Sequence, residues 1–274
     1  MKLILFHVQT QRTLFPQNIA LAADQTTAIV LRTIDFSETS LIVTLLTRDY
    51  GRLSALAKGA YRPKGPFEGA LDLLAVCRVV VIRKNTDTLD LLTEAKLQRR
   101  FRGAERSLER LYAGYYVAEM LRLLTDNHDP HPDLYDLTLK TLAQIDGAGP
   151  VAASLAFFDA QALRLLGHAP ATDKCTQCGD SVKQTARMIF ALIGGGVVCH
   201  GCRNRQHQTV SVRREVIDEF RRLGSETLQL PIQIQPAIYG ELRAVMNRYI
   251  QTLLGTQPRM QSFLPTAIRT EPTA

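Results

Sequence analysis

The chain has 274 residues, which suggests two or three structural units rather than one small domain. No run approaches the roughly 18 apolar residues of a transmembrane helix, and the apolar run at the N-terminus is too short for a secretory signal. We therefore exclude a membrane-spanning protein and expect a cytoplasmic one. The net charge is +7 and the pI about 9.3, which is typical of proteins that bind nucleic acid, although proteins of membrane surfaces share it.

Residues 1–25 match no element well, and we expect an N-terminal extension there. Between residues 26 and 102 the sequence has five runs rich in Val, Ile, Leu and Thr, separated by turn-like segments such as RDYG and KNTD. Five short strands with brief connections favour a closed barrel, because an open sheet would leave two exposed edges. The five-stranded OB-fold has this size, so the sequence predicts an OB-fold that binds nucleic acid.

From residue 103 to residue 255 the apolar residues recur at spacings of three and four, which predicts helices. The segment GPVAASLAFFDAQALRLLG is apolar on nearly every side and should be the buried helix of this group. Ser211 is a plausible start for a later helix, and Gly224 and Gly255 are plausible ends. We expect residues 256–274 to be a loose tail. The predicted fold class is α+β, with the barrel followed by an all-α domain that carries a small insert.

The insert is predicted from four cysteines, in CTQC at 175–178 and CHGC at 199–202. Two CxxC pairs at this spacing are typical of a structural zinc site, since each pair directs two sulfurs at one point. We expect a zinc-ribbon-like insert at about residues 172–206, with the ligands Cys175, Cys178, Cys199 and Cys202. A redox-active CxxC pair and His200 as a replacement ligand are the alternatives. Cys77 is most simply a buried apolar residue.

Most of the positive charge lies in one region. Between Arg48 and Arg110 there are fourteen Lys and Arg against eight Asp and Glu, and a local field of this sign attracts phosphates. The stretch AKGAYRPKGPF carries three cations and no acid, and it predicts a loop that follows a sugar–phosphate backbone, with Tyr61 and Phe67 stacking on bases. A solvated loop that serves solubility is the alternative. The candidate DNA-binding residues are Arg52, Lys58, Tyr61, Arg62, Lys64, Arg83, Lys84, Arg99 and Arg100.

The order of barrel, helical region and four-cysteine insert, together with AIVLRTIDFSETSLIVTLLTRDYGRLSALAKGAYRPKG, resembles the RecO family of bacterial recombination mediators. This resemblance implies a protein of DNA repair that binds single- and double-stranded DNA and anneals complementary strands. It also implies contact with the single-stranded-DNA-binding protein SSB, and loading of RecA together with RecR. An apolar pocket rimmed by cations should bind the acidic tail of SSB. The candidate residues for that pocket, beside Leu123, are Arg110, Tyr116, Arg122 and Lys140.

Three other function classes make different predictions from a DNA-binding mediator. The sequence has no GxxxxGK[ST], HExxH or GxSxG motif, so we expect no catalytic residues and no enzyme. An RNA-binding zinc module of translation or transcription would share the basic charge and the cysteine pairs. A purely structural adaptor is the third class, and it predicts no nucleic-acid binding at moderate salt.

Overall fold

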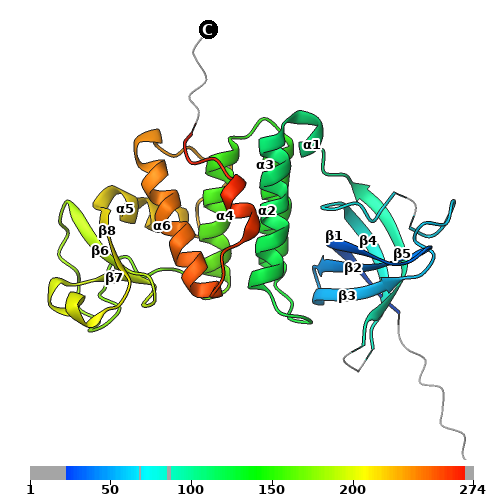
Figure 1. The fold of residues 1–274 in the computed structure, drawn as a ribbon, viewed down its shortest axis with the longest axis horizontal. Helices are drawn as coiled ribbons and strands as arrows, with labels where there is room; N and C mark the ends of the chain where they lie inside the picture. Colours follow the sequence, from blue (N-terminus) through cyan, green and yellow to red (C-terminus); the bar gives the residue numbers. More distant parts are fainter. Residues whose placement is uncertain (1–22, 68, 85–87, 269–274) are drawn as a thin grey trace, which may run out of the picture.

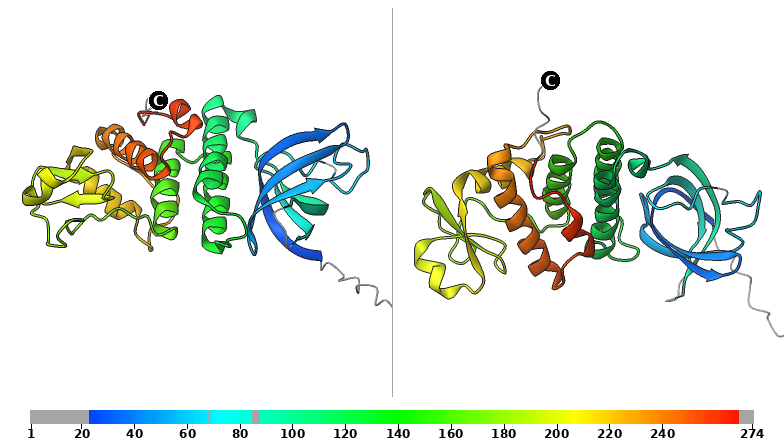
Figure 2. Two further views of the ribbon diagram at one scale, coloured as in Figure 1. Left: turned by 60° about the horizontal axis from the view of Figure 1, so that its bottom comes forward. Right: turned by 45° about the horizontal axis from the view of Figure 1, so that its top comes forward.

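The computed structural model describes residues 23–67, 69–84 and 88–268. The described residues form an elongated molecule, with a β-barrel at one end, a group of helices in the middle and a small sheet at the other end (Figures 1 and 2). None of the helices in these ranges combines the length and the hydrophobicity needed to cross a bilayer.

The barrel is closed and has five strands in the order β1-β2-β3-β5-β4, which confirms the predicted barrel. The strands are β1 (Ala23–Ser37), β2 (Ser40–Thr47), β3 (Gly51–Ala57), β4 (Val76–Ile82) and β5 (Asp90–Arg99). Neighbours pair antiparallel except β3 and β5, which are parallel. Alternation places every second residue of β3 inside, where Leu53, Ala55 and Ala57 are fully buried. Cys77 also lies in this core, and its thiol donates to the Ala70 carbonyl oxygen at 2.8 Å.

The helical body contains α1 (Gly103–Arg106), α2 (Leu108–Leu124), α3 (Pro132–Asp146), α4 (Val151–Leu165), α5 (Arg214–Leu223) and α6 (Pro236–Leu254). The N-terminus of α2 is capped by Ser107, whose side chain accepts from the Arg110 N–H at 3.2 Å. Every residue of α4 from Val151 to Leu163 is buried, as its all-round apolar sequence predicted. The core of the body extends to the outer side of the barrel, where Ile29 and Leu31 join it, so the two units share a packed junction.

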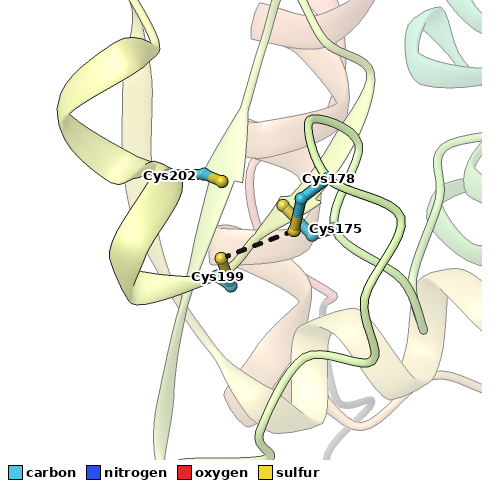
Figure 3. A group of neighbouring side chains, drawn as sticks. All are labelled: Cys175, Cys178, Cys199 and Cys202. Carbon is cyan, nitrogen blue, oxygen red and sulfur yellow. Dashed lines mark hydrogen bonds between the residues drawn. The ribbon is translucent and has the colours of Figure 1, made fainter.

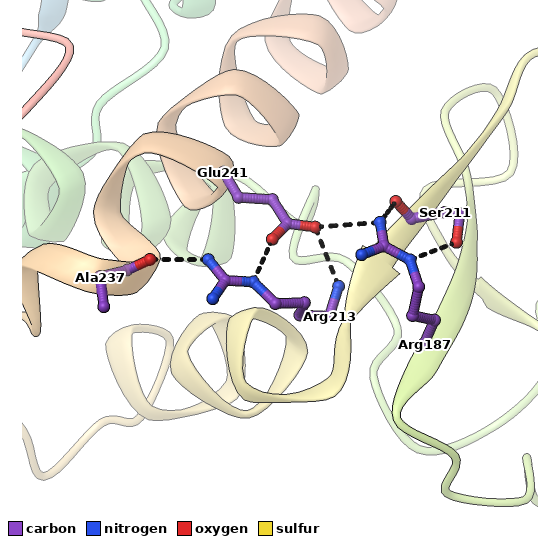
Figure 4. A network of polar contacts seen from close by, with 5 residues as sticks. All are labelled: Arg187, Ser211, Arg213, Ala237 and Glu241. Carbon is purple, nitrogen blue, oxygen red and sulfur yellow. Dashed lines mark hydrogen bonds and ion pairs between the residues drawn. The ribbon is translucent and has the colours of Figure 1, made fainter.

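A three-stranded sheet, with the order β7-β6-β8, lies beyond α5 and α6. It comprises β6 (Arg187–Ala191), β7 (Gly196–Val198) and β8 (Thr209–Arg213), and the 3-10 helix η1 (His200–Arg205) follows β7. Polar contacts of Glu241, in α6, connect this sheet to the helical body (Figure 4). Its carboxylate accepts from the Arg213 N–H at 3.0 Å and pairs with the guanidinium groups of Arg213 and Arg187.

Three local predictions are wrong. The first described strand begins at Ala23, three residues before the predicted barrel, because Ala23 to Ile29 pair with β4. Ser211 does not start a helix, since it lies in β8, which pairs with β6. Residues 256–268 are not loose: they form a short helix, η2 (Arg259–Phe263), whose Arg259 and Met260 N–H groups donate to the Glu119 carboxylate of α2 at 2.9 and 2.8 Å.

Candidate nucleic-acid interface and metal centre

The loop after β3, residues 58–65, has a defined backbone conformation, and we call it the cationic loop. Gly59 has a φ of +72°, which turns the chain directly after Lys58. Two short-range bonds close the loop, from the Arg62 N–H to the Gly59 carbonyl (3.0 Å) and from the Gly65 N–H to the Arg62 carbonyl (3.1 Å). The backbone polar groups therefore bond to one another, and the long side chains of the loop remain in solvent.

Lys58, Arg62 and Lys64 are all exposed on this loop. Among the described residues, none of the three side chains takes part in an ion pair or a hydrogen bond, in contrast to many cations elsewhere on the molecule. Three charges close together on one short loop repel one another unless an anion lies between them. The loop is therefore well suited to bind phosphate groups.

The hairpin that joins β1 to β2 supports the cationic loop. The Tyr61 N–H donates to the Thr39 carbonyl at 3.2 Å, and the Tyr61 hydroxyl donates to the Asp35 carboxylate at 2.5 Å. This hydrogen bond raises the pKa of Tyr61, and burial and the charge of Asp35 raise it further, so the hydroxyl is neutral. The ring itself is exposed. Phe67 does not accompany it: its side chain is buried in the barrel core and is unavailable for the predicted stacking.

Three of the other predicted cations lie at the opposite end of β3. Arg52, near the start of β3, donates to the Asn127 side chain at 3.0 Å and to the Arg122 carbonyl, so it joins the barrel to the helical body. Arg83 pairs with Asp24 at 2.6 Å and lies over the Tyr50 ring at 4.3 Å. Lys84 follows Arg83 and is exposed. These residues do not extend the cationic loop.

Arg99, the last residue of β5, and Arg100, which follows it, lie at a third location. Arg100 pairs with Asp72 at 3.1 Å and donates to the Gly69 carbonyl at 3.2 Å. Arg99 is half-buried opposite Val76, at the start of β4. The structure thus brings together Lys58, Tyr61, Arg62 and Lys64 of the nine predicted residues and distributes the other five around the barrel.

The four cysteines of the two CxxC pairs converge on one point (Figure 3). Cys175 and Cys178 lie in the loop after α4, Cys199 precedes η1, and Cys202 lies within η1. All four sulfur atoms lie within 4.8 Å of one another. Tetrahedral coordination with metal–sulfur bonds of about 2.3 Å requires sulfur separations of roughly 3.8 Å, so small side-chain adjustments suffice to bind one metal ion. His200 is exposed and is not part of this group.

The backbone around the cysteines favours the thiolate form of one ligand. Burial raises the pKa of Cys175, but hydrogen bonds from backbone N–H groups of Cys199, Cys178 and Gln177 outweigh it and lower the pKa to about 6. A hairpin lies between the two pairs, with Ile189 opposite Val198 in β6 and β7, and it brings the second pair back over the first. The site can therefore hold a metal ion, and it is built from local structure.

A pocket lies where the barrel meets the helical body, and we call it the junction pocket. It has a volume of about 580 Å³ and combines apolar with charged side chains. Its lining includes Leu31, Arg32, Leu73, Tyr115, Glu119, Arg122, Leu123, Arg259 and Met260. Burial lowers the pKa of Arg122, and the charge of Arg32, another cation of this pocket, lowers it further. The predicted pair of Arg122 and Leu123 thus lies in a cation-rimmed apolar pocket.

The other candidates for an SSB site lie elsewhere. Tyr116 is fully buried, with its hydroxyl bonded to Asp159, and it reaches no surface. Arg110 donates to the carbonyls of Ile145 (2.6 Å) and Gly149 (3.2 Å), so it caps the end of α3. Lys140 is exposed on α3, outside the junction pocket. Arg32 and Arg259 also line the pocket, and neither was predicted from the sequence. No sequence signal indicated Arg259, since its segment was expected to be loose.

Comparison with known proteins identifies the family. The family model described as Recombination protein O C terminal matches residues 105–262, and the one described as Recombination protein O N terminal matches residues 22–101. The chain belongs to the RecO family. It is 56% identical to the DNA repair protein RecO of Rhodopirellula baltica over 263 residues, covering 87% of this chain and 97% of that relative. It is 32% identical to RecO of Myxococcus xanthus over 239 residues, covering 86% and 95%.

These RecO relatives are matched over nearly their whole length, so the family assignment applies to the barrel and the helical body together. A third relative, RecO of Moorella thermoacetica, is 28% identical over 242 residues, covering 88% of this chain and 90% of that relative. Membership of this family of DNA repair proteins confirms the resemblance drawn from the barrel and cysteine motifs.

Proposed function

We propose that this protein is a non-enzymatic mediator of recombination that binds single- and double-stranded DNA through the phosphates and anneals complementary strands. The observation that carries the proposal is the exposed group Lys58, Arg62 and Lys64, which has no anionic partner among the described residues. Contacts of this kind are made to phosphates and carry no sequence information, so binding is expected to depend steeply on salt and weakly on sequence.

Annealing follows from the same contacts. Two single strands repel each other through their phosphates, and a cationic surface that holds one of them reduces that repulsion. Because phosphate contacts do not read the bases, register is left to base pairing between the strands. The proposal therefore needs no covalent chemistry and no catalytic residue.

The junction pocket is our proposed site for SSB. Its cations, among them Arg32, Arg122 and Arg259, complement an acidic peptide, and Leu123 and Met260 supply apolar surface beside them. Engagement of SSB would bring the protein to SSB-coated strands, where with RecR it would promote the loading of RecA. These partners are proposed from family membership, and the pocket supports the SSB contact.

We further propose that the metal is one structural Zn²⁺. Four thiolates are the ligand set that zinc prefers, and they leave no open coordination position for a reactive water. The site lies at the opposite end of the molecule from the cationic loop (Figure 1). Zinc would therefore stabilise the small sheet and take no part in holding DNA.

The test is a strand-annealing assay with complementary oligonucleotides coated with SSB. The proposal predicts that the purified protein accelerates duplex formation, that neither ATP nor its hydrolysis is needed, and that added salt suppresses the effect. Competition between single-stranded DNA and RNA of matched sequence addresses the RNA-binding alternative. A failure to anneal, or a clear preference for RNA, would contradict the proposal.

A further inference from the structure

Three large apolar side chains are exposed on the β1–β2 hairpin and on the cationic loop that is hydrogen-bonded to it. Phe36 is 58% exposed, Tyr61 56% and Ile34 41%, and they are three of the nine large apolar residues that the described structure leaves exposed. Ile34 and Phe36 lie at the end of β1, and Tyr61 lies in the cationic loop. A single exposed apolar side chain is ordinary, whereas several around one hairpin and loop need a reason.

Phe36 lies in a projecting segment, from Arg32 to Thr39, in which every residue is exposed, and it also lies at a bulge. In the pairing of β1 with β2, Asp35 lies opposite Leu41 and Ser37 opposite Ser40, so Phe36 is an extra residue without a partner in the ladder. Such a bulge redirects a side chain away from the regular alternation of the strand. Phe36 accordingly belongs to neither the barrel core nor the core of the helical body.

Hydrogen bonds join the loop that carries Tyr61 to the hairpin that carries Phe36. The Tyr61 hydroxyl donates to Asp35, the residue before Phe36, and the Tyr61 N–H donates to Thr39 of the same hairpin. The Gly59 N–H donates to the Ser40 hydroxyl at 3.4 Å. These bonds connect the cationic loop, which carries the unpartnered cations, to the hairpin that carries Phe36.

The cations around this hairpin and loop favour an anionic ligand, and the exposed aromatic rings favour a ligand that also has flat apolar groups. The loop supplies three cations, and the hairpin supplies two acids, Asp35 and Glu38. Asp35 is engaged by Tyr61, and Glu38 is exposed. Single-stranded nucleic acid has this combination, because its phosphates bind cations and its unpaired bases stack on aromatic rings. In a duplex the base faces are covered by their neighbours.

We propose that Phe36 is a base-stacking residue, which holds an unpaired base while the cationic loop holds the adjoining phosphates. The proposal rests on the DNA-binding function proposed above and adds to it a means of telling single strands from duplex. Duplex would contact the loop cations alone. Stacking on one base changes affinity by about 5- to 150-fold, so Phe36 would set much of the preference for single strands.

The test measures the affinity of Phe36→Ala for a single-stranded oligonucleotide, its duplex, and the same strand with abasic sites, each by fluorescence anisotropy. Ile193→Ala is the matched control, since Ile193 is an exposed aliphatic side chain on the distant β6–β7 turn. Phe36→Trp keeps an aromatic ring and serves as the rescue variant. A 2-aminopurine base in the strand reports stacking directly through quenching of its fluorescence.

We expect Phe36→Ala to lose at least 5-fold in affinity for the normal single strand, to bind duplex and abasic strand as the unaltered protein does, and to quench 2-aminopurine less. Phe36→Trp should restore both readouts. Unchanged single-strand affinity, or an equal loss on abasic strand and duplex, would overturn the stacking role while leaving the cationic loop as a DNA site. A loss of binding to a protein partner with DNA affinity intact would also overturn it. If the unaltered protein binds no DNA, the function proposed above fails as well.

Discussion

Arg243 of α6 and Asp159 of α4 form an ion pair in the centre of the helical body, where both side chains are buried. Tyr116 of α2 completes the group, because its hydroxyl donates to Asp159 at 3.0 Å and accepts from Arg243 at 2.9 Å. Three helices are thereby joined by charged and polar groups that water does not reach. A buried pair of this kind is sensitive to the loss of either partner, since the remaining charge stays desolvated.

Replacement of one partner should destabilise the protein strongly. We expect Asp159→Asn or Arg243→Met to lower the free energy of unfolding by about 3–5 kcal/mol, measured by chemical denaturation. The double variant Asp159→Leu/Arg243→Met removes both charges and should lose less than either single variant. If each single variant costs under about 1 kcal/mol, the pair is not the structural link described here.

Removal of the metal should destabilise the small sheet and spare DNA binding. Chelation or Cys175→Ser is expected to lower the melting temperature, because the proposed zinc would hold together the sulfur atoms of four separate residues. The fraction that remains folded should bind DNA with less than about a threefold change, since the cationic loop is remote. His200→Ala is the control and should retain the metal. If the unaltered protein binds one zinc per chain and His200→Ala binds none, His200 is a ligand.

Glu241 should make stability depend on pH in the acid range. Burial raises its pKa, but the hydrogen bonds and charge of Arg213 outweigh it, so the pKa is lowered below the ordinary value of 4.5. A depressed carboxyl pKa contributes stability that is present above the unfolded pKa and is lost as pH falls through the folded one. Glu241→Gln should therefore cost about 0.5–1 kcal/mol at pH 7, and this cost should shrink as the pH falls through the acid range and the native carboxylate is protonated. A difference between variant and unaltered protein that does not vary with pH would contradict this.

Residues that line the junction pocket should bind SSB, whereas candidates from the sequence that lie outside the pocket should not. We expect Arg122→Gln to weaken binding of the acidic C-terminal peptide of SSB by tenfold or more, because it removes a charge from the pocket. Lys140→Gln is the matched control, since Lys140 was predicted from the sequence but lies outside the pocket. Calorimetry with the isolated peptide measures both. Equal effects of the two variants would exclude the pocket.

The sequence predicted the elements that follow from local pattern. Runs rich in Val, Ile, Leu and Thr between turn-like segments predicted the barrel strands, and the spacing of two CxxC pairs predicted a cluster of four cysteines that can hold a metal ion. It did not predict which cations are free, because the partners of Arg52 and Arg83 are distant in sequence. Phe67 and Tyr61 have similar sequence surroundings, yet one is buried and the other exposed. The bulge at Phe36 depends on the register with β2, which no single segment specifies.

The salt dependence of DNA binding gives an estimate of the phosphate contacts. For single strands, the slope of log affinity against log salt is about −0.7 for each phosphate neutralised. Replacement of Lys58, Arg62 and Lys64 by Gln should therefore make the slope shallower by about 2. Anisotropy titrations across a range of salt concentrations measure it. A slope that does not change would mean that these side chains do not contact phosphates.

The central claim is that the cationic loop holds DNA, and reversal of its charge tests this most directly. The variant Lys58→Glu/Arg62→Glu/Lys64→Glu is compared with Lys140→Glu/Lys183→Glu/Arg248→Glu, which has the same net charge and alters exposed residues outside the barrel. Affinity for a single-stranded oligonucleotide is measured at one moderate salt concentration, after circular dichroism confirms the fold of both. The account predicts that the loop variant loses binding by at least a hundredfold and that the control loses less than tenfold. Equal affinities of the two variants would contradict it.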